Sequence, residues 1–351
     1  MQINTILEYK LKGERNNRPR VPIIFTGKVF VIFVYDRKGF LESKIQCLSI
    51  DSFSLLWEYI HPHVINNLVV SETGSLLASC MNGEVLSFSI QDGAVIWRYR
   101  TLSGNIGSIS NEVNSRIVFS GIQGSQWTWC LDTNTGTEIW KVKNSGHSYQ
   151  PSIFEDKVVN SIEHQLFCLD LSSGKTIWKV SESKTYLFNP IVAKNMAICS
   201  GHGLINFYNI ESGKLITTIQ TGQPTNERES SIWRVTADES SIYFGDAKGF
   251  FYSYSFPHLN SFSFLSLNSR KNTSQRWKIE TKGGIESIPA FFQDSILVIN
   301  NGNQFLRIDK SNGHIIQETN TKGEAFTSGV TVAKDLIFYS CYGGTVVKIS
   351  M

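Results

Sequence analysis

The stretch LDTNTGTEIWKV, Leu131–Val142, is followed by a near copy, LDLSSGKTIWKV, Leu169–Val180. Both read as an apolar strand, a polar turn that ends in glycine, and a second strand that carries a tryptophan. Weaker versions of this pattern recur along the chain at intervals of about forty residues. The chain is therefore a repeat protein, and this pattern is its unit.

Each copy has one characteristic position in its last strand, most often tryptophan. The residues at this position are Tyr9, Trp57, Trp97, Trp140, Trp178, Thr217, Trp277 and Gln317. The glycines that end the preceding turns are Gly93, Gly136, Gly174, Gly213 and Gly313. Glycine suits the last residue of a short hairpin loop, which needs positive φ. We expect the tryptophans to pack on the neighbouring repeat rather than to stack on a ligand.

Two further strand-like runs precede the hairpin in most copies, as in KVVNSIE or MAICSG. Four strands in about forty residues are typical of a propeller blade. The C-terminal run lacks its aromatic strand, and an N-terminal segment at about residues 4–12 has that strand's character. The sequence predicts an all-β, single-domain, eight-bladed propeller over residues 1–351, with four-stranded antiparallel blades and a last blade closed by the N-terminal strand. A sandwich of ordinary hairpins is the alternative, and it leaves the regular spacing unexplained.

The bulk composition disfavours several classes of partner. The 351 residues carry a formal net charge of +3 and no block of five like charges, which disfavours nucleic-acid and membrane binding. The N-terminus has no continuous apolar segment, so we expect a cytoplasmic protein. We also expect it to be a monomer. Six isolated cysteines in apolar runs are expected to be reduced and buried.

The two quoted stretches resemble the PQQ-enzyme repeat family, the quinoprotein alcohol dehydrogenase-like propellers. The resemblance implies the propeller fold but does not select a function, because that superfamily includes dehydrogenases, an outer-membrane assembly scaffold and many cytosolic propellers. Its dehydrogenases hold PQQ between a tryptophan and a disulfide of adjacent cysteines. This sequence has no adjacent cysteine pair, so PQQ is disfavoured and no cofactor is predicted.

Histidines suggest one candidate site. His147, His164 and His202 map to loops of blades four and five on the face where the blades connect, and we expect them to lie near one another. With Tyr149, they are candidates for acid–base catalysis, or for holding a divalent metal. The alternative is that these loops contain histidine without a functional role. No metal ligand is assigned from the sequence.

Polar residues at the starts of the inner strands form a second candidate site. A recurring proline aligns these starts in RVP, QPS, NPI and SIP. The candidate ligand-binding residues on this face are Arg20, His63, Gln150, Asn189, Trp233, Arg234, Asp246 and Glu286. Two guanidinium groups among amides can clamp a carboxylate or a phosphate. The alternative is that polar residues only line a wet channel mouth.

Three irregular segments interrupt the repeat. Tyr35–Lys44 is expected to enlarge a loop on the channel face, and Thr221–Arg234 to form a long linker over the channel. Ser255–Gln275 is an insertion on the opposite face, either a docking surface or tolerated length.

Two functions remain open. The first is a binding or scaffold propeller that presents its channel face to a protein, a peptide or a small anionic ligand. The second is a non-quinoprotein enzyme with its active site at the channel mouth, in a biosynthetic pathway.

Overall fold

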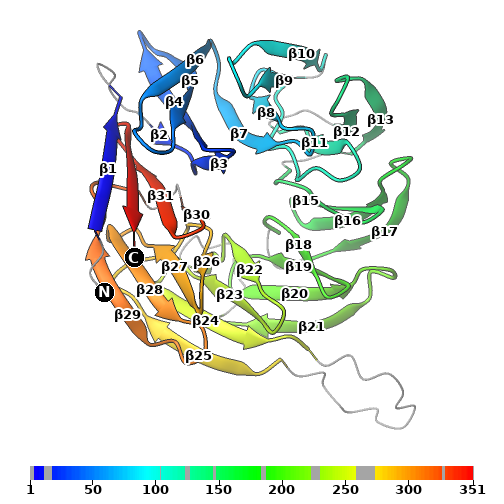
Figure 1. The fold of residues 1–351 in the computed structure, drawn as a ribbon. Helices are drawn as coiled ribbons and strands as arrows, with labels where there is room; N and C mark the ends of the chain where they lie inside the picture. Colours follow the sequence, from blue (N-terminus) through cyan, green and yellow to red (C-terminus); the bar gives the residue numbers. More distant parts are fainter. Residues whose placement is uncertain are drawn as a thin grey trace.

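In the computed structural model of the chain, the repeated strand–turn–strand units form eight antiparallel sheets arranged in a ring (Figure 1). The structure describes residues 4–11, 18–102, 104–122, 127–144, 148–182, 187–222, 230–257, 273–325 and 329–350. Within each sheet, strands that are consecutive in sequence are neighbours, apart from the two sheets at the ends of the chain. The predicted fold class, an eight-bladed all-β propeller, is confirmed.

The first four blades lie between Arg18 and Ser181. Blade 1 contains β2 (Arg18–Pro19), β3 (Ile23–Phe25), β4 (Lys28–Arg37), β5 (Phe40–Ser49) and β6 (Leu55–His61). Blade 2 contains β7 (Ile65–Val70), β8 (Ser75–Cys80), β9 (Glu84–Ser89) and β10 (Val95–Arg100). Blade 3 contains β11 (Arg116–Ser120), β12 (Trp127–Asp132) and β13 (Glu138–Lys143). Blade 4 contains β14 (Ser152–Phe154), β15 (Lys157–Ile162), β16 (Gln165–Asp170) and β17 (Thr176–Ser181).

The last four blades complete the ring. Blade 5 contains β18 (Ile191–Ala193), β19 (Met196–Ser200), β20 (Leu204–Asn209) and β21 (Leu215–Gln220). Blade 6 contains β22 (Val235–Ala237), β23 (Ser241–Gly245), β24 (Phe250–Ser255) and β25 (Gln275–Glu280). Blade 7 contains β26 (Ala290–Phe292), β27 (Ser295–Ile299), β28 (Gln304–Asp309) and β29 (Ile315–Asn320). Blade 8 contains β30 (Val330–Ala333), β31 (Leu336–Cys341), β32 (Thr345–Ser350) and β1 (Asn4–Lys10).

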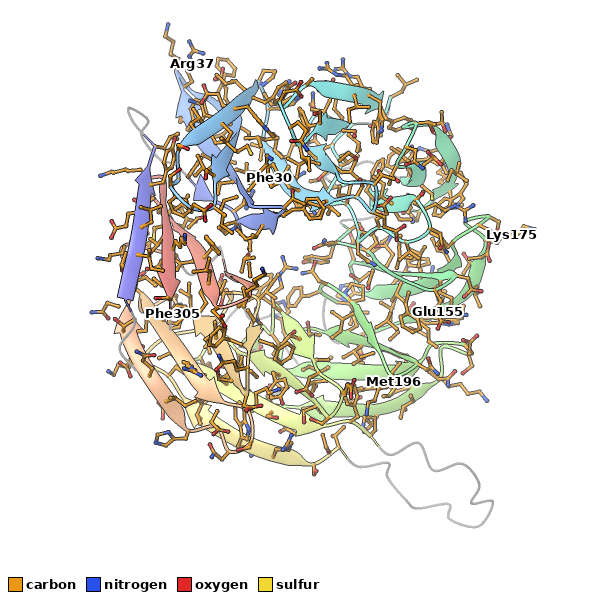
Figure 2. The ribbon with its side chains drawn as sticks, viewed as in Figure 1. Phe30, Arg37, Glu155, Lys175, Met196 and Phe305 are labelled. Atoms are coloured by element: carbon orange, nitrogen blue, oxygen red, sulfur yellow. The ribbon has the colours of Figure 1, made fainter. Side chains whose placement is uncertain are left out.

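Two blades depart from the four-strand pattern. In blade 3 the inner segment is no regular strand, and it meets the rest of the sheet through isolated bridges, such as Ile106 with Gly121, and single backbone hydrogen bonds, such as Ser110 N–H to the Val118 carbonyl. In blade 1 the predicted loop Tyr35–Lys44 is instead the tip of a long β4–β5 hairpin, with a tight turn at Lys38 and Gly39. Arg37 and Phe40 pair across this tip, and Arg37 lies at the periphery of the ring (Figure 2). The expectation of an enlarged loop was therefore wrong, because the backbone pairing of β4 with β5 continues to Arg37 and Phe40.

The ring closes through the two ends of the chain. β1 pairs antiparallel with β32, with Tyr9 opposite Val346, and the two termini lie side by side in Figure 1. Lys348 Nζ also donates a hydrogen bond of 2.8 Å to the carbonyl of Ile50 in blade 1. The predicted closure by the N-terminal strand is confirmed, and β32 is thereby paired on both sides.

The hydrophobic core is divided into eight clusters, and each cluster fills the space between two adjacent blades. One buried member of each, taken around the ring from blades 1 and 2 to blades 8 and 1, is Phe88, Phe119, Val158, Cys199, Phe244, Val298, Tyr339 and Phe33. The middle strands, such as β8 and β19, are buried on both faces. Each blade is therefore stabilised by its two neighbours, as in other repeat architectures.

A repeat tryptophan joins blades 1, 2, 3, 4 and 6 each to the next blade. Trp140 of blade 3 donates from Nε1 to the carbonyl of Leu171 at 2.8 Å, and its ring covers Gly174 of blade 4. Gly174 has φ +71°, and a Cβ placed on it would lie 2.7 Å from the indole. The same bond and contact occur for the pairs Trp57–Gly93, Trp97–Gly136, Trp178–Gly213 and Trp277–Gly313. The predicted packing role of the tryptophans is confirmed.

The cysteines lie in the inter-blade clusters. All six are buried and unpaired: Cys47, Cys80, Cys130, Cys168, Cys199 and Cys341. Burial raises the pKa of the Cys47 thiol to about 11, so the thiolate is disfavoured at neutral pH. They serve as small packing residues, as the sequence predicts.

Gly174→Ala tests the tryptophan contact. It adds a Cβ against Trp140 in a left-handed residue, and we expect a loss on the order of 2–4 kcal/mol in the free energy of unfolding. Gly27 has a similar φ of +74° but no atom within 4 Å of an added Cβ, so Gly27→Ala should cost only about 1 kcal/mol. Urea unfolding measures both variants, and equal losses would show that the indole contact contributes nothing.

Deletion of residues 1–12 tests the closure. The deletion removes β1 and leaves an unpaired edge on β32, so we expect a sharply lower melting temperature and self-association. Circular dichroism and size-exclusion chromatography measure these effects. Deletion of residues 1–3, which precede β1, is the control. A closure role is refuted if the longer deletion melts like the parent.

Candidate functional site

The candidate site is a cavity of about 380 Å³ at the ends of the inner strands. Seven of the residues singled out in the sequence line it together: Arg20, Tyr149, Gln150, Asn189, Trp233, Arg234 and Glu286. A second cavity of about 300 Å³ shares Gln150, Asn189, Arg234 and Ile288 with the first. The two cavities are therefore adjacent and share part of their lining.

The repeat explains why these side chains meet. Gln150, Asn189 and Arg234 each stand one or two residues before the inner strand of their blade, β14, β18 or β22. Because blades are related by rotation about the ring, residues in equivalent places converge around its axis. Gln150 N–H donates to Asn189 Oδ1 at 3.1 Å, which links blade 4 to blade 5 at this level.

The cavity lining carries two guanidinium groups and one carboxylate. Burial, followed by the positive charge of nearby Arg20, lowers the pKa of Arg234 to about 10. Arg234 therefore remains protonated at neutral pH. Within the described part of the chain, no carboxylate lies within 4.0 Å of its guanidinium nitrogens. An anion that entered the cavity would relieve this uncompensated charge.

Aromatic side chains hold one wall of the cavity. Phe188 is buried and stacks on Trp233, with ring centroids 4.5 Å apart and an interplanar angle of 25°. Tyr149 and His202 meet Phe188 edge-on at 5.4 and 5.0 Å. Trp233 Nε1 is buried and has no hydrogen-bond partner among the described residues. Phe188 was missed in the sequence, where its apolar ring reads as ordinary core, although it stands next to Asn189.

The candidate histidines are placed differently. His147 lies outside the described residues. His202 is buried behind Phe188, with Nδ1 2.8 Å from Ser231 Oγ, and His164 is half-buried in the loop between β15 and β16. Neither of these two side chains lines the cavity. Among the described residues, no three His, Cys, Asp or Glu side chains gather as a metal site.

His63 and Asp246 also lie away from the cavity. His63 is exposed, whereas its neighbour His61 is buried and places Nε2 2.9 Å from Glu84 Oε2 in blade 2. Asp246 Oδ1 accepts from the backbone N–H groups of Lys248 and Phe250, and Oδ2 accepts from the Tyr252 hydroxyl at 3.0 Å. The Asp246 carboxylate thus organises the turn between β23 and β24.

Two asparagines join the inner segments of neighbouring blades. Asn67 exchanges two hydrogen bonds with the backbone of Ile109, at 3.0 and 3.1 Å. Asn111 does the same with Ile153, both at 2.9 Å. Each side-chain amide donates to a backbone carbonyl and accepts from a backbone N–H of the next blade, as neighbouring strands do within a sheet. The sequence signal was weak, namely an asparagine near the start of each inner segment.

The family comparison agrees with the repeat. Residues 124–255 match the family described as outer membrane protein assembly factor BamB, a PQQ-type repeat. This range contains both tryptophan-bearing stretches, Leu131–Val142 and Leu169–Val180. The resemblance to PQQ-type propellers is therefore confirmed for the central blades. Among curated proteins, no sequence matches this chain.

Solved structures share the fold at low identity. BamB from Moraxella catarrhalis superposes with a TM-score of 0.72 at 13% identity, with 100% of both chains covered. Sqt1 from Chaetomium thermophilum, bound to the N-terminus of the ribosomal protein L10, gives 0.79 at 12% identity, again over 100% of both chains. The computationally designed Ika8 protein gives 0.77 at 12%, covering 97% of this chain and 98% of that one. Such identities show a common fold and no more.

The search for a membrane span adds one finding. In the described parts of the chain, no helix is long and apolar enough to cross a bilayer.

Asp246→Ala separates a turn role from a ligand-binding role. The change leaves two backbone donors and the buried Tyr252 hydroxyl without their acceptor, so we expect a loss of about 1–3 kcal/mol in the free energy of unfolding. Asp246→Asn keeps the Oδ1 acceptor and should cost less. Both are measured by urea unfolding, and anion binding should be unchanged. Lost binding with unchanged stability would contradict this assignment.

Proposed function

We propose that the protein is a binding module, because residues 124–255 match the PQQ-type, BamB-like repeat family and the chain forms a complete propeller around them. Its channel cavity holds an anionic group of a ligand or of a protein partner. The observation that carries this proposal is the pair Arg20 and Arg234 in one cavity, with the pKa of Arg234 lowered by burial and by its neighbour.

The chemistry of the lining supports a carboxylate or a phosphate. Guanidinium groups present parallel N–H donors that match the two oxygens of a planar anion. Asn189 accepts from Gln150 through Oδ1, and its Nδ2 donors have no partner among the described residues. Trp233 offers a further buried N–H. The rigid blades hold these donors in place before any ligand arrives, which lowers the entropic cost of binding.

The kind of partner is also part of the proposal. The Sqt1 structure contains the N-terminus of a ribosomal protein, so a propeller of this fold can take a protein terminus. We propose that this chain likewise binds a peptide or a protein segment on its channel face. Six buried thiols without disulfide partners support work in a reducing compartment such as the cytoplasm. The enzymatic alternative stays a prediction, because His164 and His202 stand apart from the cavity lining.

Arg234→Met tests anion binding directly. Calorimetric titration of the parent with succinate, benzoate and inorganic phosphate should show binding by at least one of them. We expect Arg234→Met to weaken that binding roughly 10- to 100-fold, as for a lost hydrogen bond to a charged group. The variant should melt no lower than the parent, since it removes a like-charge repulsion with Arg20.

Arg37→Met is the matched control. Arg37 lies at the β4–β5 tip, outside the cavity, with its Nη1 3.6 Å from Glu42. It should leave anion binding unchanged. The proposal fails if none of the three anions binds the parent, or if Arg234→Met binds them as well as the parent does.

A further inference from the structure

One cavity holds Arg234 and Glu286, and among the described residues no ion pair joins these two side chains. Glu286 of blade 7 lines the same space as Arg234 of blade 6. Among the described residues, no ion pair within 4.0 Å links Glu286 to either cavity arginine. Building on the proposed anion site, we propose that its ligand is a small zwitterion, an α-amino acid or a dipeptide. Arg20 and Arg234 hold its carboxylate, and Glu286 accepts hydrogen bonds from its ammonium group.

Two buried charged residues elsewhere, Glu84 and Lys157, form direct ion pairs, whereas the buried Asp246 and Lys348 bind neutral partners. Glu84 is buried, and its carboxylate lies 3.3 Å from Arg98 Nη1 and 2.9 Å from His61 Nε2. Lys157, also buried, lies 2.8 Å from Asp156 and 3.1 Å from Glu211. Arg234 and Glu286 follow a different arrangement, in which a cation and an anion line one cavity without a direct ion pair among the described residues. A ligand that carries both charges would satisfy them together, whereas a simple anion would leave Glu286 without a cation.

The size and the walls of the cavity narrow the ligand further. A volume of about 380 Å³ is near the lower end for small-molecule sites, where roughly 300–1,000 Å³ is usual. Ile122 and Trp233 provide apolar and aromatic surface beside the charges. Such a lining suits an apolar side chain next to a charged backbone. An amino acid or a dipeptide combines these features in a molecule of suitable size.

The test uses matched ligands on the full chain. The probes are the twenty α-amino acids and Ala-Phe, each beside its N-acetylated form, which lacks the ammonium group, and its C-terminal amide, which lacks the carboxylate. Binding is measured by thermal shift and then by calorimetry. We expect at least one zwitterion to bind, and its N-acetylated form to bind roughly tenfold more weakly or worse. Tighter binding of an amino acid would identify a free amino acid as the ligand, and tighter binding of Ala-Phe would identify a dipeptide.

Glu286→Gln gives the decisive comparison. It should weaken binding of the zwitterion about tenfold. Binding of the N-acetylated form should be unchanged, because that form has no ammonium group to interact with Glu286. Arg234→Met should weaken both. Glu239→Gln is the control, because Glu239 is exposed in the turn between β22 and β23 and should change neither.

The outcomes separate this inference from the proposed function. Equal affinity for the zwitterion and its N-acetylated form, or no effect of Glu286→Gln, would overturn the zwitterion. In that case, sensitivity to Arg234→Met would leave the anion site standing. No binding by any probe would overturn the zwitterion, while succinate, benzoate and phosphate still test the anion site on their own.

Discussion

The structure depends on the contact between a tryptophan in one blade and a glycine turn in the next. The indole lies over the backbone of the turn and donates to a carbonyl beside it, so one side chain supplies apolar contact and a directed hydrogen bond. Glycine is required for two reasons, since the turn has positive φ and a Cβ would meet the indole ring.

The exceptions follow the same constraint. Tyr9 replaces tryptophan in blade 8, and Phe53 takes the glycine place in blade 1, where its ring fills the space near Phe338. Thr217 of blade 5 faces blade 6, whose outer hairpin contains the insertion Ser255–Gln275. Phe256 of blade 6 packs into the cluster between these two blades. Gln317 faces blade 8, whose outer pair β32 and β1 has no connecting turn. Tryptophan is therefore present where the next blade offers a glycine turn.

This contact also determines the site. It fixes five of the blades against the next near the outer strands, while Asn67 and Asn111 join the inner segments of blades 2, 3 and 4. These contacts join neighbouring blades near their outer strands and, in blades 2 to 4, at their inner segments as well. Arg20, Arg234 and Glu286 line the cavity from blades 1, 6 and 7 of this ring. Charges held apart in this way favour a ligand that brings both countercharges.

The sequence alone determined the blades, their number, the closure by Tyr9's strand and the packing role of the tryptophans. These features rest on local patterns that recur, and recurrence makes each copy support the others. The register of the inner strands also brought Gln150, Asn189 and Arg234 to one place. Only the tertiary structure decided that Asp246 serves a turn, that His202 lies behind Phe188, and that Glu286 stays unpaired with Arg234. Such relations depend on distances between blades far apart in sequence, and no local pattern encodes those distances.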